Sequence, residues 1–315
     1  MKRQIRNNGS EVVQIKGTSF KKLYLQIVTV GPDDTTAPSN KDIDLTRIRI
    51  GLELTQHGQS MSSSFNAVGP TALGVLKNKD VYGMNNVGFN PTIGTTCSGY
   101  TIQDVGSGLP FQNLLVIPIL YNGMTLTEDD CLEVKIDLLT GLFSSGNATD
   151  DSKVYLVTEE GSDVEQLDLQ LPVFYPLTVD KQSPAFNENA VSEVAILSSW
   201  SDGDSREFAI QNVDLKSQYV NERYDQVTLY AKQIIETPSF VDGFNVLINN
   251  SFPSTLDKFE LNLDVDTSKL HNGCEFVYVL RAKHNARLAS RALTHRAKVG
   301  KRKALARGLN VPKNW

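Results

Sequence analysis

Carboxylates are the side chains of this sequence with the greatest scope for chemistry. A glycoside hydrolase needs only two of them, one as the acid and one as the base or nucleophile, and the chain holds 36 Asp and Glu residues. The most regularly placed are Glu133, Asp137, Glu260 and Asp264, which alternate with apolar residues in two similar segments. Such alternation predicts a solvated strand face. We therefore expect no enzyme and no catalytic residue.

Two groups of acids and the four histidines are the candidates for metal binding. The acidic groups could bind calcium in loops, but neither has a full ligand series, so solvated turns are favoured. The histidines have no H-x-H or H-x-x-x-H spacing. The sequence thus predicts no metal site and no cofactor. The residues considered are Glu128, Asp129, Asp130, Asp202, Asp204, His57, His271, His284 and His295.

Signatures of other chemistries are missing. The sequence contains no G-x-x-x-x-G-K, G-x-G-x-x-G or G-x-S-x-G segment, so the commonest nucleotide and hydrolase sites are not indicated, and no small-molecule substrate is expected. Cys97, Cys131 and Cys274 are too widely spaced for a zinc site and odd in number, which predicts free thiols. The longest apolar run, Leu114 to Leu120, is far too short to span a membrane.

The most specific functional signal is the separation of charge along the chain. Residues 281–315 hold eleven Lys and Arg and no acid, and residues 1–22 hold six against one Glu. Residues 23–280 are left with fourteen bases and thirty-five acids. This pattern predicts an acidic body with basic ends that face an anionic partner. The predicted contact residues are Lys2, Arg3, Arg6, Arg281, Lys283, Arg287, Arg291, Arg296, Lys298, Lys301, Arg302, Lys303 and Arg307.

The anionic partner could be a lipid membrane or a nucleic acid. A Lys or Arg near an anionic lipid surface contributes about 1 kcal/mol, and phosphate neutralisation gives a similar salt-dependent attraction. The segment lacks interleaved aromatic residues, so base-specific reading is not predicted. A basic end that only improves solubility is the third alternative. Residues Ala282 to about Val299 are rich in Ala, Leu, Arg and Lys and predict a helix.

The body that carries these ends reads as a series of strands. Ile48, Ile50, Leu52 and Leu54 alternate with polar residues between Thr46 and Leu54, which is the pattern of a half-buried strand. Residues 23–30 are apolar on both faces and predict a central strand. Strands are also expected over residues 111–121, 193–200, 206–213, 225–236 and 243–249. Many short strands with Gly and Pro between them indicate an all-β protein of antiparallel sandwiches or barrels.

One stretch occurs twice and suggests an internal duplication. Leu132 to Thr140 reads LEVKIDLLT, and 127 positions later Phe259 to Thr267 reads FELNLDVDT. Each copy is followed by a strand-like segment containing Tyr155 or Tyr278. A period of this length indicates two domain-sized copies. If residues 48–54 correspond to residues 227–235, the offset is about 180 there, and the first copy carries roughly fifty more residues.

These features divide the chain into five segments. We expect a basic arm over residues 1–22, a first domain over 23–172 and a linker over 173–190. A second domain is expected over 191–281 and a basic helix or tail over 282–315. The linker is predicted from three Pro between Pro172 and Pro184, and a Gly-rich insertion is predicted at about residues 56–110.

The repeated strands, the Pro-rich segment and the basic ends together resemble a family: the double jelly-roll major capsid proteins of icosahedral bacteriophages with an internal membrane. The corticovirus-like group and the lipid-containing Flavobacterium phage are among them. The resemblance implies two tandem eight-stranded jelly-roll barrels and a trimer that forms a pseudo-hexameric capsomer. It also implies partners in neighbouring capsomers and other capsid proteins, basic termini on the membrane or genome, and a place in the virion after assembly in the host cytoplasm.

Two other functions remain open at the level of sequence. A carbohydrate-binding or depolymerase β-sandwich of a phage tail or secreted system would need exposed aromatic residues in a groove. Trp200 and Trp315 are the only Trp residues, one within an expected strand and one at the end of the sequence, which disfavours it. A nucleic-acid packaging protein would instead lose all binding with residues 281–315 while its body stayed folded.

Overall fold

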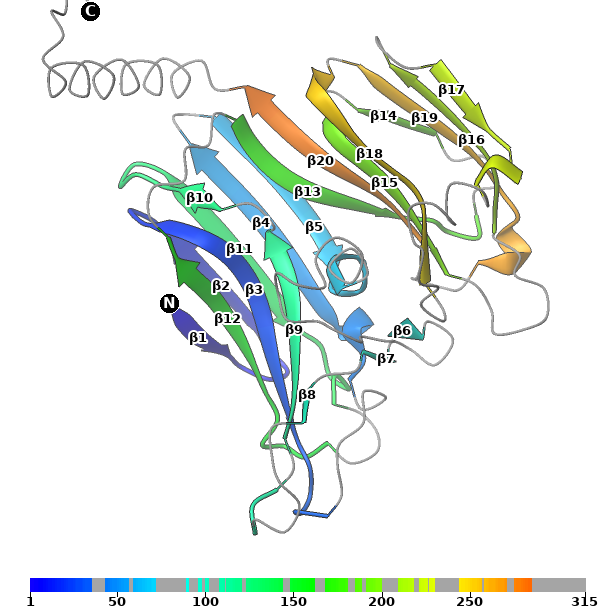
Figure 1. The fold of residues 1–315 in the computed structure, drawn as a ribbon. Coiled ribbons are helices and arrows are strands. Elements are labelled where there is room, and N and C mark those ends of the chain that lie inside the picture. The colour runs from blue at the N-terminus through cyan, green and yellow to red at the C-terminus, as the bar shows by residue number, and fades with distance from the viewer. Residues whose placement is uncertain are drawn as a thin grey trace, which may run out of the picture.

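The fold is seen in a computed structural model of the chain. It describes residues 1–35, 43–56, 59–71, 89–90, 96–97, 100–101, 108–110, 112–120, 123–143, 148–161, 168–180, 185–188, 191–199, 209–217, 221–225, 227–229, 244–256, 258–270 and 275–284. The described strands form two sandwiches of antiparallel sheets, one after the other along the chain (Figure 1).

Eight strands build the first sandwich: β1 (Lys2–Ile5), β2 (Ser10–Ile15), β3 (Ser19–Val30), β4 (Ile48–Gln56), β5 (Gln59–Asn66), β9 (Gln112–Leu120), β11 (Cys131–Leu138) and β12 (Lys153–Glu160). One sheet, here the β1 sheet, has the order β1-β12-β3-β9 and is extended by β8 (Tyr100–Thr101) and β10 (Met124–Thr125). The other, the β2 sheet, has the order β2-β11-β4-β5. Strands β6 (Phe89–Asn90) and β7 (Thr96–Cys97) form a separate pair.

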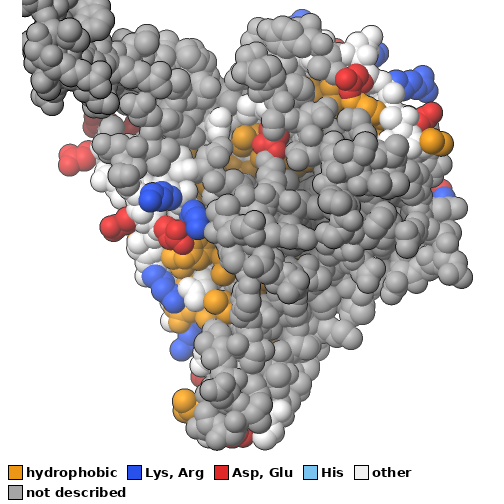
Figure 2. All heavy atoms as spheres, viewed as in Figure 1, with side chains coloured by type: hydrophobic (Ala, Val, Ile, Leu, Met, Phe, Trp, Pro, Cys, Tyr) orange, Lys and Arg blue, Asp and Glu red, His pale blue; other side chains and the backbone are white. Residues whose placement is uncertain are grey.

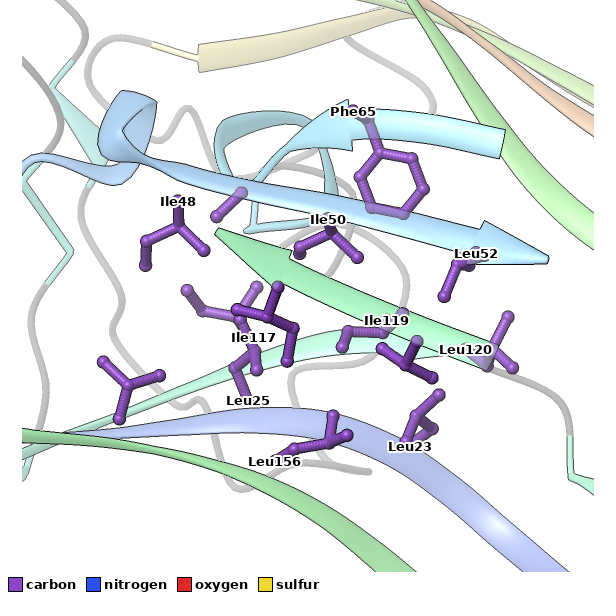
Figure 3. Close-up of a cluster of buried hydrophobic side chains, with 14 of the residues drawn as sticks. Leu23, Leu25, Ile48, Ile50, Leu52, Phe65, Ile117, Ile119, Leu120 and Leu156 are labelled. Atoms are coloured by element: carbon purple, nitrogen blue, oxygen red, sulfur yellow. The ribbon is translucent and has the colours of Figure 1, made fainter. Parts of the chain in front are cut away.

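The core of the first sandwich lies between these sheets because apolar residues alternate along the strands. In β4, Ile48, Ile50, Leu52 and Leu54 are buried while Arg49 and Glu53 are exposed, as the sequence predicts. Side chains from β3, β9 and β12 meet those of β4 and β5 across the gap between the sheets (Figure 3). Strand β3 is central, as predicted, with β12 on one side and β9 on the other.

The second sandwich also has eight strands: β13 (Asp168–Pro176), β14 (Ala185–Glu188), β15 (Val191–Ser199), β16 (Ile210–Ser217), β17 (Asn221–Tyr224), β18 (Phe244–Leu256), β19 (Phe259–Val265) and β20 (Phe276–His284). The β13 sheet has the order β13-β20-β15-β18, and the β14 sheet has the order β14-β19-β16-β17. Val194, Ile196, Val277 and Val279 of the first sheet enclose a core with Val213, Leu215 and Leu261 of the second.

The order of strands identifies both sandwiches as jelly rolls. Counted along each sandwich, the strands lie in the order 1-8-3-6 in one sheet and 2-7-4-5 in the other. Two Greek keys wound into two sheets produce this arrangement. The predicted fold class, two tandem eight-stranded jelly rolls, is confirmed. A 3-10 turn precedes β4 (η2, Leu45–Arg47) and another follows β19 (η4, Thr267–Lys269).

The repeated stretch marks the same strand in both sandwiches. β11 and β19 are the seventh strands, and β12 and β20, which carry Tyr155 and Tyr278, are the eighth. The fourth strands are β4 and β16, so the correspondence of residues 48–54 with 227–235 is wrong. Leu52 pairs with Val134, and Leu215 pairs with Leu261. Leu52 and Leu215 are thus equivalent and 163 positions apart, which makes the first copy 36 residues longer between its fourth and seventh strands.

The structure differs from the expected division of the chain in two places. Residues 1–22 are part of the first jelly roll, because β1 pairs with β12 and β2 with β11. Residues 173–190 contain most of β13 and all of β14, which are strands of the second jelly roll. Proline is tolerated in β13 because that strand is the edge of its sheet, where a missing N–H breaks no ladder bond.

Two shorter expectations are also corrected. The strand expected over 225–236 is, in its described part, a helical turn over Val227–Leu229. Asp225 directly follows β17. Its carboxylate caps the turn by accepting a hydrogen bond from the Thr228 backbone N–H at 2.8 Å. The helix expected from Ala282 does not begin there, since residues 282–284 belong to β20. The rest of that helix lies outside the described residues, and so does most of the expected insertion at 56–110.

Candidate functional site

Of the acidic residues considered for metal binding or catalysis, Asp130 is held within the fold. The buried Asp130 carboxylate accepts hydrogen bonds from the Thr127 N–H at 2.9 Å and the Thr127 hydroxyl at 2.8 Å. Glu260 and Asp264 point to solvent, and Glu133 and Asp137 are half-buried on the outer face of β11. Within the described part of the chain, no three potential ligands come together as a metal site. Asp202, Asp204, His57, His271 and His295 lie outside that part.

The predicted basic residues of the N-terminus lie on or next to an edge strand. Lys2 and Arg3 belong to β1, and Arg6 follows it. The Lys2 ammonium stands 4.2 Å above the centre of the Tyr155 ring, a favourable cation–π position. Arg3 Nε contacts Glu11 Oε2 at 3.3 Å, and the Arg6 backbone N–H donates to the same carboxylate. These three residues are exposed, so they remain available to a partner.

The C-terminal basic residues begin on the last strand of the second jelly roll. Arg281 lies in β20, and its Nη2 donates a hydrogen bond to the Tyr175 hydroxyl at 2.6 Å. Lys283 lies in the same strand opposite Leu169. The remaining predicted contact residues lie outside the described residues: Arg287, Arg291, Arg296, Lys298, Lys301, Arg302, Lys303 and Arg307. In the described part, no helix is long and apolar enough to cross a membrane.

Both basic segments start beside the connection between the two jelly rolls. β1 begins opposite the last residues of β12, and β20 ends opposite the first residues of β13 (Figure 1). Only residues 161–167 separate the end of β12 from the start of β13. Acids are mixed with the bases here: Lys22 Nζ lies 3.4 Å from Glu159 Oε2. On the face shown in Figure 2, Lys and Arg likewise alternate with Asp and Glu over the described surface.

The two jelly rolls of the chain pack on one another. The β13 sheet is apolar on both faces: one covers the core of the second jelly roll, and the other packs on the first (Figure 1). Phe174 is the centre of this contact. Its ring stands 5.0 Å from that of Phe65 on β5, and 5.2 Å from that of Tyr278, between centroids. Phe276 completes the group at 6.4 Å from Phe174.

The first jelly roll meets these rings with its fifth strand and the helical turn that follows. The Ser63 hydroxyl on β5 donates a hydrogen bond to the Pro172 carbonyl of β13 at 2.5 Å. Gly69 lies in the turn after β5, and a Cβ at that position would come within 2.5 Å of the Phe174 ring. Glycine is therefore required for the turn to approach the ring. The two jelly rolls form one continuous body through this contact.

Burial in this contact raises the pKa of a tyrosine. Tyr278 is 1% exposed. Burial, followed by the nearby Glu193 carboxylate, raises the pKa of its phenol well above 10.0. Tyr24, on the outer face of the β1 sheet, also has a raised pKa, first through burial and then through Glu159. Both phenols are neutral at physiological pH.

None of these contact residues was predicted from the sequence. Phe174 and Tyr175 were assigned to a linker because Pro172, Pro176 and Pro184 surround them, although five consecutive non-polar residues from Leu171 to Tyr175 are a signal of a strand buried on both faces. Gly69 stands in a segment with many glycines, and nothing in the sequence distinguishes it from the others.

The comparisons with known proteins agree with the fold and go no further. No family model matches the chain, and no curated protein matches its sequence. The STIV MCP, from Sulfolobus turreted icosahedral virus, matches at 12% identity with a TM-score of 0.47, over 92% of this chain and 96% of that one. The mavirus major capsid protein matches at 12% identity and a TM-score of 0.32, over 90% and 87%.

An enzyme is also similar in arrangement. A peptide-N(4)-(N-acetyl-β-D-glucosaminyl) asparagine amidase matches at 11% identity with a TM-score of 0.35, over 91% of this chain and 96% of that one. The candidate site of this chain has to be taken from its own surfaces, which are the sheet faces, the strand edges and the two basic ends.

Proposed function

We propose that the chain is a structural subunit of a viral capsid, without catalytic activity, and that three copies form a capsomer of six jelly rolls. The observation that carries the proposal is the way the two jelly rolls pack. One contributes the outer face of its β13 sheet, and the other contributes its fifth strand and the following turn. The two surfaces are different, so the contact is head-to-tail.

A head-to-tail contact between equivalent units can be repeated. The first jelly roll has an outer β1-sheet face that corresponds to the face covered in the second, and the second has a fifth strand, β17, that corresponds to β5. Each chain therefore carries both halves of the contact, one on each jelly roll. Repetition closes into a ring when the rotation allows it, and a ring of three chains gives the pseudo-hexameric outline that tiles a shell.

The basic segments supply the second part of the proposed function. We propose that Lys2, Arg3, Arg6, Arg281 and Lys283, with the later bases of residues 285–315, face an anionic membrane or a packaged nucleic acid. The start of both segments beside the connection between the two jelly rolls supports a common inner side. The resulting place of the chain is the capsid shell of a virion assembled in the host cytoplasm.

Membership of the internal-membrane bacteriophage group belongs to the same proposal. Two of the compared structures are of viral capsid proteins, but the proposal rests on the packing of the jelly rolls and on the charge of the termini. Neighbouring capsomers and other capsid proteins would be the partners of the outer edges.

The state of association of the purified chain tests the capsid proposal. We expect trimers in analytical ultracentrifugation and triangular or hexagonal particles in negative-stain images. Obligate interfaces of this kind commonly bury above about 2,000 Å², so the trimer should persist on dilution. A chain that stays monomeric at every concentration and salt tested would contradict the proposal.

The anionic partner is tested by flotation with liposomes and by binding to duplex DNA and single-stranded RNA. The matched control is the chain ending at residue 284, which keeps every described strand and loses residues 285–315. We expect the full chain to bind anionic vesicles, or nucleic acid, with an affinity that falls steeply as salt rises. Equal binding to neutral and anionic vesicles, or unchanged binding by the shortened chain, would contradict an electrostatic anchor.

A further inference from the structure

The helical turn after the fifth strand is covered in one jelly roll and uncovered in the other. In the first, residues 67–71 are all buried, and Gly69 lies against Phe174 of the second jelly roll. In the second, the corresponding turn presents Val227, which is 77% exposed. Val227 is the most exposed of the large hydrophobic side chains in the described part of the chain. The turn is uncovered because a single chain has no third jelly roll to place on it.

The matching receptor is the outer face of the β1 sheet. Tyr155 on β12 and Tyr278 on β20 are equivalent, since each lies on the eighth strand between two residues buried in the core of its own jelly roll, Val154 and Leu156 in β12 and Val277 and Val279 in β20. Tyr278 is covered by the first jelly roll. Tyr155 is only half-buried, and the Lys2 ammonium lies above its ring. The face around Tyr155 therefore corresponds to a surface that is covered elsewhere in the same chain.

The strand registers give the pairs of residues that would meet. Ser63 pairs with Leu52, and Glu222 pairs with Leu215. Because Leu52 and Leu215 are equivalent, Ser63 and Glu222 are equivalent too. Pro172 lies two residues before Phe174 on β13, opposite Leu280, and Lys2 lies two residues before Gln4 on β1, opposite Val157. Pro172 and Lys2 are thus equivalent.

The contact seen within the chain then predicts a charged contact between chains. Within the chain, the Ser63 hydroxyl donates to the Pro172 carbonyl. At the equivalent positions stand Glu222 and Lys2, which are both exposed and have opposite charges. The same transfer places Tyr224, the equivalent of Phe65, near Gln4, the equivalent of Phe174. The opposite charges of Glu222 and Lys2 would make a contact between two copies electrostatically complementary.

We propose that Glu222 and the turn at Val227 of one copy dock on the β1-sheet face of a second copy, with the Glu222 carboxylate accepting a hydrogen bond from the Lys2 ammonium. Val227 then covers apolar surface beside Tyr155, as residues 67–71 cover the rings around Tyr278. This assignment rests on the proposed head-to-tail association. It adds the partner surface and gives Lys2 a further role in assembly.

The test is chemical cross-linking between two variants that each carry one added cysteine besides the native Cys97, Cys131 and Cys274. Lys2→Cys and Glu222→Cys chains are mixed, allowed to associate, and treated with a short bis-maleimide. We expect a covalent dimer from the mixture and none above the wild-type background from either variant alone. Mixing Lys135→Cys with Glu222→Cys is the matched control, since Lys135 is an exposed lysine on the outer face of the β2 sheet and should not cross-link.

A charge exchange provides the second measurement. Lys2→Glu should weaken association by about tenfold, because like charges then meet at the contact, and Lys2→Glu with Glu222→Lys in the same chain should restore it. If trimers form but the cross-link does not, this docking is overturned and the proposed capsid function stays intact. The same holds if the double exchange fails to restore association. A wild-type chain that never associates overturns both.

Discussion

The ring of Phe174 meets the ring of Phe65 at an interplanar angle of 60°, with 5.0 Å between centroids, and this contact joins the two jelly rolls. Edge-to-face pairs of this kind contribute about 0.5–1.5 kcal/mol beyond the area that they bury. Phe174 also lies against Tyr278 and Phe276, so a single side chain connects β5 of one jelly roll with the β13 sheet of the other. Phe174 therefore joins the two jelly rolls directly.

Replacing Phe174 by Ala should destabilise the whole chain. Removal of a buried Phe leaves a cavity and costs about 3–5 kcal/mol, and here the cavity lies at the junction of the two jelly rolls. Urea unfolding followed by tryptophan fluorescence and circular dichroism measures the loss. Val179→Ala is the matched control, because Val179 is 55% exposed and its truncation should change stability by less than about 0.5 kcal/mol. Equal losses in the two variants would contradict a central role for Phe174.

The strands and the internal repeat could be predicted from the sequence because each depends on the local order of residues. The alternation in β4 places Ile48, Ile50, Leu52 and Leu54 on one face whatever the neighbouring strands are. The similarity of β11 to β19 survives because both are seventh strands with one solvated and one buried face. These local features were enough for the fold class.

The boundary between the jelly rolls could not be predicted from the sequence, because it depends on where a strand lies in its sheet. Pro172 suggests a linker, but β13 is an edge strand, and an edge tolerates a residue without an N–H. The contact surface was missed for a similar reason. Phe174 and Gly69 are 105 positions apart, and only the packing of complete sheets brings them together.

Gly69→Ala should be more harmful than an alanine at an ordinary strand glycine. The new Cβ would approach the Phe174 ring to 2.5 Å, so the ring or the turn must shift. Overpacking of this kind costs about 1–3 kcal/mol. Gly51→Ala is the control, because a Cβ there meets Lys135 at an acceptable 3.4 Å. The thermal midpoints of both variants check the prediction, which requires a lower midpoint for Gly69→Ala than for Gly51→Ala.

That loss should be relieved by a smaller neighbour. The double variant Gly69→Ala with Phe174→Leu makes room for the methyl group, so it should lose less stability than the sum of the two single changes. The interaction free energy from the double-mutant cycle measures this coupling. Strict additivity would mean that Gly69 and Phe174 do not constrain each other.

The turn after β19 should depend on the ionised form of Asp266. Its carboxylate accepts hydrogen bonds from the Ser268 N–H at 3.1 Å and the Ser268 hydroxyl at 2.6 Å, and these bonds lower the pKa of Asp266. A lowered pKa in the folded state stabilises the fold above the ordinary pKa of Asp, and the effect disappears as the pH falls through the folded value. Asp266→Ala should therefore lower the thermal midpoint at neutral pH and differ less from the parent in strong acid. A constant difference across the acid range would contradict this origin.

Alkaline unfolding should be governed in part by Tyr278. Burial and Glu193 raise the pKa of its phenol well above 10.0, so the folded state favours the neutral form. The stabilisation is complete below the ordinary tyrosine pKa and is lost as the pH rises toward the folded value. Phenolate absorbance should therefore show Tyr278 ionising together with unfolding. Tyr278→Phe should remove the late, cooperative part of the titration. Ionisation of Tyr278 before any loss of circular dichroism would show that the junction between the two jelly rolls opens on its own.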